Sequence, residues 1–153
     1  LSAHPRAILL IAGDGPLRTE CEAVAARLGI SAAVRFAGQR TDVPSMLAAM
    51  DIVAVSSSRE GFGYAVVEAG AAGKPVVGFR VDALVETIRH GETGILVPPQ
   101  DATALAAALS RLLSDPTLAT RLGEAARHHA QAYSIDQHVR GLEALYCRVV
   151  ERV

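Results

Sequence analysis

The stretch that decides the fold is DIVAVSSSREGFGYAVVEAGAAGKPVVGF, residues 51–79. It begins with one aliphatic run, DIVAVSS (51–57), and ends with another, KPVVGF (74–79). Both runs are short, mostly without polar alternation, and bounded by Ser, Gly or Pro, as in the buried strands of a parallel sheet. Between them, GYAVVEAGAAG (63–73) has a helical composition and stops at a Gly-Lys-Pro sequence. This stretch therefore predicts two strands joined by a helix.

The same alternation continues on both sides of this stretch. Further strand-like runs lie at 7–13, 33–38 and 94–99, and further helical patterns lie at 17–28, 42–50 and 83–91. We therefore expect an α/β fold with a Rossmann-like parallel sheet of about five strands and helices on both faces. Right-handed crossovers place the loop after each strand at the carboxyl edge of the sheet, where such folds bind their ligands.

The chain becomes wholly helical after its Pro-Pro pair at 98–99. Asp101 is placed to cap one helix, Pro116 to open the next, and Ser134 or Asp136 to cap a last one. In the same way, Asp42 is placed to cap the helical pattern at 42–50. We expect one domain over 1–153, with an α/β core at 1–99 and a helical C-terminal extension at 100–153.

The composition excludes several classes of protein. Half of the residues are hydrophobic and a fifth are charged, which is typical of a globular domain. Fifteen basic residues against sixteen acidic ones argue against a dominant nucleic-acid surface. Neither a membrane-spanning run nor a signal peptide is visible. Cys21 and Cys147 are expected to be free thiols in a reducing, cytoplasmic compartment. The chain begins without Met and reads as a piece of something longer.

The turn AGDGP (12–16) joins the first strand to a helix. Its glycines, Gly13 and Gly15, allow backbone N–H groups to approach a phosphate, although a tight structural turn is an equal alternative. A dinucleotide fingerprint would require glycine at position 18, which is Arg18, and an acidic residue after the next strand, where the sequence has GQR. NAD is therefore disfavoured.

The turn SSSREGFG (56–63) is more informative, because it precedes a helix at the carboxyl edge of the sheet. Gly61 and Gly63 remove side chains where that helix starts, so the N–H groups of residues 62–65 are available to a ligand. The helix dipole adds roughly half a positive charge there. This combination predicts a seat for phosphate.

Two glutamates, Glu60 and Glu68, flank this helix start. Glu60 lies before the helix and Glu68 lies one to two turns inside it, so their carboxylates are placed to contact different parts of one elongated ligand. Carboxylates are good acceptors for sugar hydroxyls. A solvated helix position is the structural alternative for Glu68. Four histidines, His90, His128, His129 and His138, are interpreted as surface or helix-end residues.

These motifs resemble those of GT-B glycosyltransferases of the group 1 type, a retaining family. Glu60 and Glu68 look like its E-x7-E segment. Further blocks resemble the family in the same order: LLIAGDGPLR, VRFAGQRTDVPSMLAAMDIVAVSS, EGFG, GKPVV, GETGILVPPQDATALAAAL and LGEAARHHA. The resemblance implies the C-terminal, nucleotide-sugar-binding domain of such an enzyme, without the acceptor-binding N-terminal domain.

The resemblance also implies roles for individual residues. Glu60 would contact the hydroxyls of the donor sugar as the catalytic residue, and Glu68 would bind the ribose. The implied donor-binding residues are Gly13, Gly15, Gly38, Gln39, Arg40, Arg59, Gly61, Phe62, Gly63, Tyr64 and Glu68. No metal and no cofactor besides the nucleotide diphosphate sugar are implied, in agreement with the absence of a DxD pair from the sequence.

Two departures from the family pattern stand out. The first strand and helix of the family's donor domain, with a GR…KG unit that neutralises the diphosphate, have no counterpart here. In the usual strand order that strand is central, so we expect a gap in the sheet that is covered by a partner chain or by self-association, or else a rearranged strand order. In addition, Asp82 and Ala83 stand where the family often has Gly-Gly, which puts a negative charge near the diphosphate. Arg59, Arg80 and Lys74 are the remaining nearby cations, with ordinary surface roles as the alternative.

Three functions follow from these observations. The first is the donor domain of a retaining glycosyltransferase that moves a sugar to a hydroxyl acceptor. The second is a nucleotide-sugar-binding module without catalysis, and the third, less favoured, is a GT-B sugar-nucleotide epimerase. Peripheral association of the parent enzyme with the inner face of the membrane is an open alternative to a purely cytoplasmic location.

Overall fold

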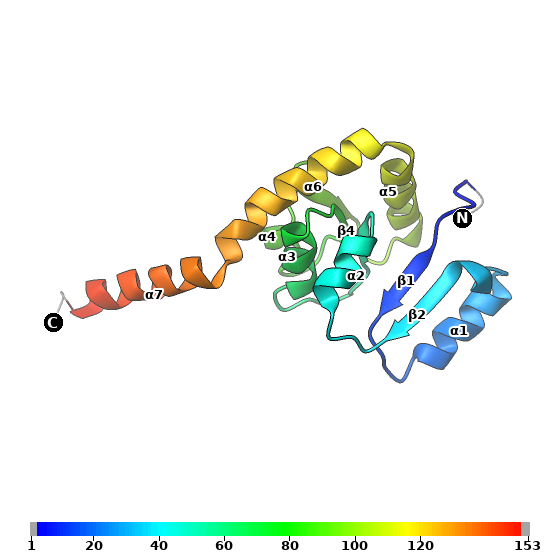
Figure 1. Cartoon of the computed structure of the whole chain (residues 1–153), viewed down its shortest axis with the longest axis horizontal. Helices are drawn as coiled ribbons and strands as arrows, with labels where there is room; N and C mark the ends of the chain where they lie inside the picture. Colours follow the sequence, from blue (N-terminus) through cyan, green and yellow to red (C-terminus); the bar gives the residue numbers. More distant parts are fainter. Residues whose placement is uncertain (1–2, 151–153) are drawn as a thin grey trace. The chain divides into compact units, whose positions relative to one another are not determined.

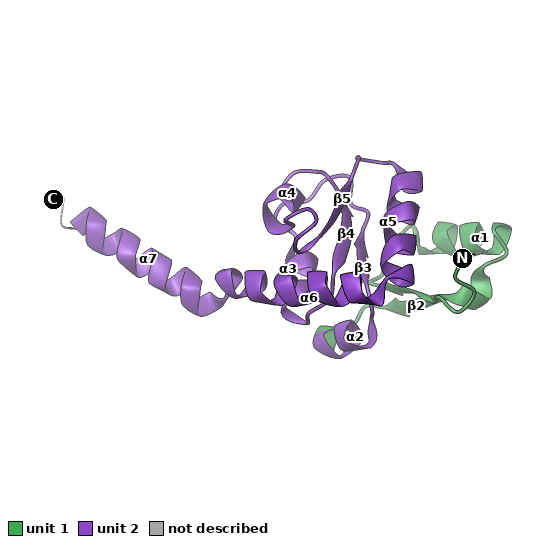
Figure 2. Ribbon diagram, turned by 90° about the horizontal axis from the view of Figure 1, so that it is seen from above, with its two compact units in different colours: residues 1–43 green, residues 44–153 purple. Residues whose placement is uncertain are grey.

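The computed structural model of the chain describes residues 3–150, which form five strands, seven α-helices and two short 3₁₀ helices (Figure 1). These elements belong to two compact units, Leu1–Val43 and Pro44–Val153 (Figure 2). Each unit has its own parallel sheet.

The first unit is a small strand-helix-strand layer. Strand β1 (Leu9–Ala12) pairs in parallel with β2 (Val34–Gly38), and α1 (Arg18–Arg27) with the 3₁₀ helix η1 (Ser31–Ala33) connects them. Among its described residues, Ala25 and Val34 are the buried hydrophobic ones. The unit therefore has little core of its own.

The second unit holds the larger sheet, in the order β3-β4-β5 with both pairings parallel. Its elements in chain order are α2 (Val43–Ala49), β3 (Val53–Val55), α3 (Tyr64–Ala71), β4 (Val76–Phe79), α4 (Leu84–Thr87), β5 (Gly94–Val97), α5 (Ala102–Ser114), α6 (Pro116–Ala130), η2 (Gln131–Tyr133) and α7 (Ile135–Val150). All residues of β4 and β5 are buried, as the aliphatic runs predict.

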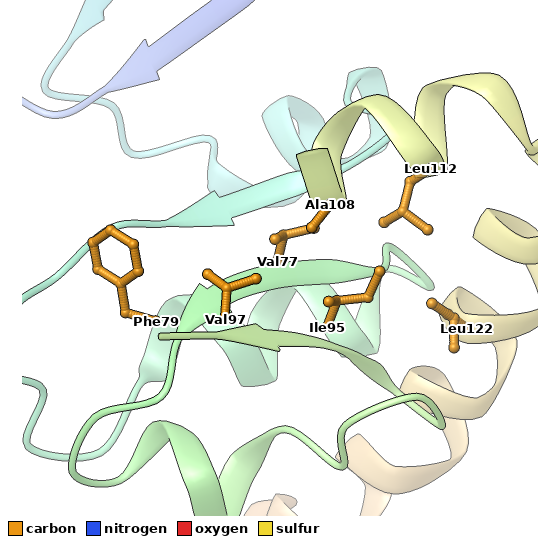
Figure 3. Close-up of a cluster of buried hydrophobic side chains, with 7 residues drawn as sticks. All are labelled: Val77, Phe79, Ile95, Val97, Ala108, Leu112 and Leu122. Atoms are coloured by element: carbon orange, nitrogen blue, oxygen red, sulfur yellow. The ribbon is translucent and has the colours of Figure 1, made fainter. Parts of the chain in front are cut away.

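Helices cover both faces of this sheet, with α5 on one side and α3 with α4 on the other (Figure 2). Side chains alternate along the strands, so four of them point toward α5. Figure 3 shows this cluster, which consists of Val77, Phe79, Ile95 and Val97 with Ala108 and Leu112 from α5 and Leu122 from α6. On the opposite face, a Cβ at Gly94 would clash with the backbone of Val76 and touch Ile88. Glycine at position 94 therefore lets β5 lie close to its partner residue Val76 in β4.

Helix α6 packs directly on α3. A Cβ at Gly70 would lie 3.1 Å from the carbonyl oxygen of Ala126, so the small residue allows the two helices to approach. Asp101 caps α5 by accepting the N–H of Ala104 at 2.8 Å, as the sequence predicts. Asp115 caps α6 through the N–H of Leu118 at 2.9 Å, and Ser134 accepts the N–H of Gln137 at 3.4 Å at the start of α7.

Helix α7 differs from the other helices of its unit in its exposure. Its described residues include no buried one. Its exposed large hydrophobic side chains are Ile135, Val139, Leu142, Leu145, Tyr146, Val149 and Val150.

The α/β class, the five parallel strands and the helical C-terminal part are confirmed, but the single sheet is wrong. Among the described residues, β1 pairs only with β2, and β3 pairs only with β4, so the five strands belong to two separate sheets. Sequential strands are neighbours in both sheets, so neither sheet has a rearranged order. The division into residues 1–99 and 100–153 stays a prediction, whereas the division of the structure lies at residue 43.

Two local predictions are also wrong. The helix expected at 83–91 is only the four residues of α4, because Ile88 is extended and its side chain is buried against the sheet. Asp42 does not cap α2 through its side chain; both of its carboxylate oxygens accept from the guanidinium of Arg40, at 2.8 and 2.7 Å. Cys21 and Cys147 are free, as expected. None of the helices between residues 3 and 150 has the length and apolarity needed to cross a membrane.

Candidate functional site

The loop between β3 and α3 contains most of the predicted site residues. Gly63 immediately precedes α3 and has a φ of +85°, which a residue with a side chain rarely adopts. A Cβ at this position would also lie 3.1 Å from Leu84 and 3.4 Å from Thr87. Gly63 is therefore required by the conformation and by the packing, whereas Gly61 has open space around it.

The carboxylate of Glu60 folds back onto the start of α3. Its Oε1 atom accepts the N–H of Gly63 at 3.2 Å, and the residue is half-buried. The sequence prediction placed the N–H of Gly63 toward a ligand, but in this structure Glu60 binds it. The N–H groups of Tyr64 and Ala65 remain in the first turn of the helix, where intrahelical acceptors are lacking.

The loop before α4 holds the backbone of Glu60 from the other side. Asp82 Oδ2 accepts the N–H of Glu60 at 3.0 Å, and the N–H of Ala83 donates to the carbonyl oxygen of Glu60 at 3.4 Å. Asp82 has a φ of +36°, in the region that favours glycine. Its carboxylate therefore binds and positions Glu60, a role that the sequence prediction of an adverse charge near the diphosphate had missed.

Three aromatic rings lie along this loop. Phe62, which is 37% exposed, contacts Tyr64 at 4.9 Å between centroids and Tyr133 of η2 at 5.7 Å, the latter edge to face at 77°. Tyr64 is 73% exposed. The sequence analysis did not identify Tyr133 as a site residue. The sequence feature that marks it is its position directly before Ser134, which caps the next helix.

Glu68 lies on the exposed face of α3, one turn after Tyr64. The buried face of the same helix consists of Val66, Ala69 and Gly70. Arg59 is exposed at the start of the loop. The second unit thus brings together Arg59, Glu60, Gly61, Phe62, Gly63, Tyr64 and Glu68 on one loop and the adjoining helix face.

The remaining predicted residues belong to the first unit. The N–H of Gly13 donates to the carbonyl oxygen of Gly38 at 2.8 Å, and both glycines have positive φ, +112° and +65°. The N–H of Gly15 donates to Asp14 Oδ1 at 2.8 Å, so the carboxylate of Asp14 takes the position at which a phosphate was expected. Gln39 is exposed beside them.

Several cations near these loops are already paired. Arg40 makes two hydrogen bonds to Asp42, which raise the pKa of the guanidinium and lower the pKa of the carboxyl. The Nζ of Lys74 donates to the carbonyl oxygen of Ala48 at 3.1 Å. Arg18 binds Glu22 at 2.9 Å. Arg40 and Lys74 are thus engaged by groups of the chain itself.

The hydroxyl of Tyr133 connects three elements. It donates to the carbonyl oxygen of Glu86 at 3.3 Å and lies 3.4 Å from Nε2 of His129 on α6. Burial lowers the pKa of His129 below its usual 6.5, the charge of Arg89 lowers it further, and Glu92 opposes the shift. The imidazole is therefore kept more neutral than a free histidine.

A small cavity adjoins this contact between α3 and α6. Its volume of about 10 Å³ is lined by residues that include Val67, Thr87, His129 and Tyr133. That space holds at most one water molecule, so it is no sugar pocket. Over residues 3–150 no three His, Cys, Asp or Glu side chains gather as metal ligands would. The expectation of a metal-independent site stays a prediction.

The chain is similar to known proteins over most of its length. Residues 1–129 match the family described as glycosyl transferases group 1. D-inositol 3-phosphate glycosyltransferase of Salinispora arenicola is 42% identical over 129 residues, which are 83% of this chain and 29% of that protein.

Solved structures agree with this match. Sucrose-phosphate synthase of Thermosynechococcus elongatus superimposes with a TM-score of 0.87 at 32% identity, over 99% of this chain and 41% of that one. HepE of Anabaena, solved in complex with UDP, gives a TM-score of 0.83 at 29% identity, over 92% of this chain and 41% of that one. The chain thus spans less than half the length of these relatives.

Proposed function

The chain belongs to the group 1 glycosyl transferase family, and from this premise we propose that it is the donor-binding part of a glycosyltransferase. The whole enzyme transfers a sugar from a nucleotide diphosphate sugar to a hydroxyl acceptor with retention of configuration. The acceptor is bound by a further domain, as the greater length of the relatives suggests.

The observation that carries this proposal is the geometry of the loop from Glu60 to Gly63. A glycine with positive φ brings the chain into α3 without a side chain in the way, and the first turn of that eight-residue helix presents the N–H groups of Tyr64 and Ala65. These groups and the helix dipole favour a diphosphate at this end of the helix.

The two glutamates complete the proposed donor site. Glu60 uses one carboxylate oxygen for the N–H of Gly63, and the other oxygen accepts from a hydroxyl of the donor sugar. Asp82 and Ala83 fix the backbone of Glu60, so its side chain starts from a defined position. Glu68, exposed on α3, accepts from the ribose hydroxyls of the nucleotide.

The residues of this chain are proposed to assist the reaction by electrostatic stabilisation of the departing diphosphate. As the glycosidic bond breaks, negative charge develops on the departing diphosphate, and N–H groups already aimed at it stabilise that charge without reorganisation. Because Lys74 is engaged by the carbonyl oxygen of Ala48, we expect Arg59, which is exposed at the start of the loop, and further cations from outside this chain to neutralise the diphosphate. No residue of the chain is assigned as a nucleophile or as a base.

A non-catalytic nucleotide-sugar-binding module is the second candidate for the chain by itself. It is favoured by one observation, namely that the chain spans only 29% to 41% of the relatives described above. The two candidates share the donor site and differ in turnover. Transfer or donor hydrolysis by the chain would support the enzyme, whereas binding without either would support the module.

Isothermal titration of the chain with UDP, GDP and ADP tests the donor site. We expect one nucleotide to bind and Glu68→Ala to weaken its binding, because the ribose contact is lost. Glu124→Ala removes a glutamate from an exposed position on α6 and serves as the matched control. If none of the three nucleotides binds, or if Glu68→Ala binds as tightly as the unchanged chain, the proposed site is wrong.

The proposal extends to a partner for the outer edge of β3. This strand pairs with β4 on one side only among the described residues, and an unpaired buried edge is costly. We propose that an extended segment of a second copy of the chain pairs there in parallel. Light scattering coupled to gel filtration tests this proposal: we expect a species larger than the monomer, and a strict monomer at all concentrations would contradict it.

A further inference from the structure

We propose that Tyr133 is a positioning residue for the donor-binding loop: its ring contacts the loop at Phe62, and its hydroxyl contacts α4 at Glu86. The restraint on the loop is independent of the proposed function, and only the expected effect of Tyr133 on nucleotide binding rests on that function. Tyr133 belongs to η2, more than sixty residues after the loop in sequence, and it is half-buried.

The first contact is made by the ring of Tyr133. It packs edge to face on Phe62, with centroids 5.7 Å apart and planes at 77°. Phe62 is the residue between Gly61 and Gly63. A Cβ built on Gly61 would meet no atom within 4 Å, so Phe62 is the residue through which the aromatic contact restrains this part of the loop.

The second contact is made by the hydroxyl group. It donates to the carbonyl oxygen of Glu86 at 3.3 Å, at the end of the segment that begins with Asp82. Asp82 and Ala83 are the residues that hold the backbone of Glu60. Tyr133 therefore contacts both the loop that carries Phe62 and the segment that fixes Glu60.

Helix α6 supplies the support for Tyr133 itself. His129 lies one turn before it, with ring centroids 5.4 Å apart and perpendicular planes, and its Nε2 atom is 3.4 Å from the hydroxyl oxygen. The hydroxyl gives its one proton to Glu86, and its oxygen accepts from His129 in the tautomer that carries the proton on Nε2. Since α6 is packed against α3, this arrangement ties the loop to the body of the unit.

Removal of this residue is expected to act locally. Tyr133 lies outside the cluster of buried side chains between the sheet and α5, which contains Val77 and Leu112. Tyr133→Phe keeps the ring and removes the two contacts of the hydroxyl, to Glu86 and to His129, while Tyr133→Ala also removes the ring contact with Phe62. The pair of variants thus separates the two parts of the proposal.

Amide hydrogen exchange of the chain, followed by NMR, tests the restraint without any ligand. In Tyr133→Ala we expect the N–H of Gly63, which donates to Glu60, to exchange about three to ten times faster. Tyr133→Phe should show a smaller acceleration, and the N–H groups of Val77 and Ile95 in the core sheet should be unchanged in both variants. Equal acceleration at all of these groups, or no change at Gly63, would overturn the proposal.

Titration with UDP provides the second readout. We expect Tyr133→Ala to bind UDP about three to ten times more weakly, because part of the binding free energy is spent on ordering the loop. Tyr146→Ala, at an exposed tyrosine of α7, is the matched control and should bind as the unchanged chain does. Unchanged affinity in Tyr133→Ala would overturn its role in binding. If the unchanged chain binds none of UDP, GDP and ADP, the proposed donor site fails, and the exchange experiment decides the role of Tyr133 independently.

Discussion

The two glycine turns that follow β1 and β3 have similar sequences and different supports. In each, an acidic side chain accepts the N–H of a nearby glycine: Asp14 that of Gly15, and Glu60 that of Gly63. Around the first turn, a Cβ at Gly15 would meet nothing within 4 Å, whereas a Cβ at Gly63 would press on Leu84 and Thr87. The comparison shows that a glycine turn becomes a defined site only when neighbouring elements fix its conformation.

The largest difference in stability loss between the two turns is expected when alanine replaces one glycine in each. Gly63→Ala should destabilise the protein by about 2–4 kcal/mol, from a disfavoured positive φ and from overpacking against Leu84. Gly15→Ala should cost less than about 1 kcal/mol, because its space is open. Urea unfolding of both variants measures the difference. Similar losses in the two variants would show that the turns are equally constrained.

The next largest effect concerns the acidic residues of the two turns. Glu60→Ala should cost about 1–2 kcal/mol of stability, because the N–H of Gly63 loses its acceptor at a helix start, and it should also weaken nucleotide binding. Asp14→Ala removes an acceptor from an exposed turn and should cost less. Thermal unfolding and UDP titration of both variants provide the check. A larger stability loss in Asp14→Ala than in Glu60→Ala would reverse the comparison.

A smaller effect is expected at Asp82, which supports only the second turn. Asp82→Ala should cost about 1 kcal/mol, because alanine tolerates the positive φ poorly and the N–H of Glu60 loses its acceptor. Asp82→Asn keeps an acceptor oxygen and a residue type that tolerates this conformation, so it should be nearly neutral. Measuring the free energy of unfolding of both variants checks this prediction. If asparagine is as harmful as alanine, the negative charge and not the hydrogen bond is what matters.

The smallest expected effect is a pH dependence at His129. Because the pKa of His129 is lowered in the folded chain, the unfolded chain takes up its proton first as the pH falls below about 6.5. The stability contribution is therefore present above pH 6.5 and is lost as the pH falls toward the lower, folded pKa. Unfolding of His129→Gln between pH 7.5 and 5 should vary less steeply than that of the unchanged chain. His128→Gln, at the exposed neighbouring position, should keep the original slope.

Much of the fold follows from the sequence because two of its strands, β4 and β5, are buried along their whole length. The aliphatic runs that contain β4 and β5 have no competing interpretation, and Asp101 and Asp115 mark the helix starts where they lie. The missing central strand predicts a gap in one sheet, but the division into two sheets was not predicted. The single sheet failed because parallel strands pair only with neighbours that are present.

The candidate site was only partly predictable. Glycine spacing and the position after a strand identified the loop at Glu60 and Gly63. Sequence patterns do not show which N–H groups and cations are already bound by other groups of the chain. The contacts of Arg40 with Asp42 and of Lys74 with Ala48 were therefore missed. Tyr133 was missed for a similar reason, because its partners Phe62 and Glu86 are distant in sequence.

The central claim is that a nucleoside diphosphate binds at the start of α3. Titration of the isotopically labelled chain with UDP, followed by amide NMR, tests it most directly. The account predicts that the largest shifts occur at Gly61, Gly63, Tyr64 and Ala65, and that they are reduced in Glu68→Ala. Shifts confined to other elements such as α5 and α7, or no shifts at millimolar concentrations of UDP, GDP and ADP in turn, would contradict it.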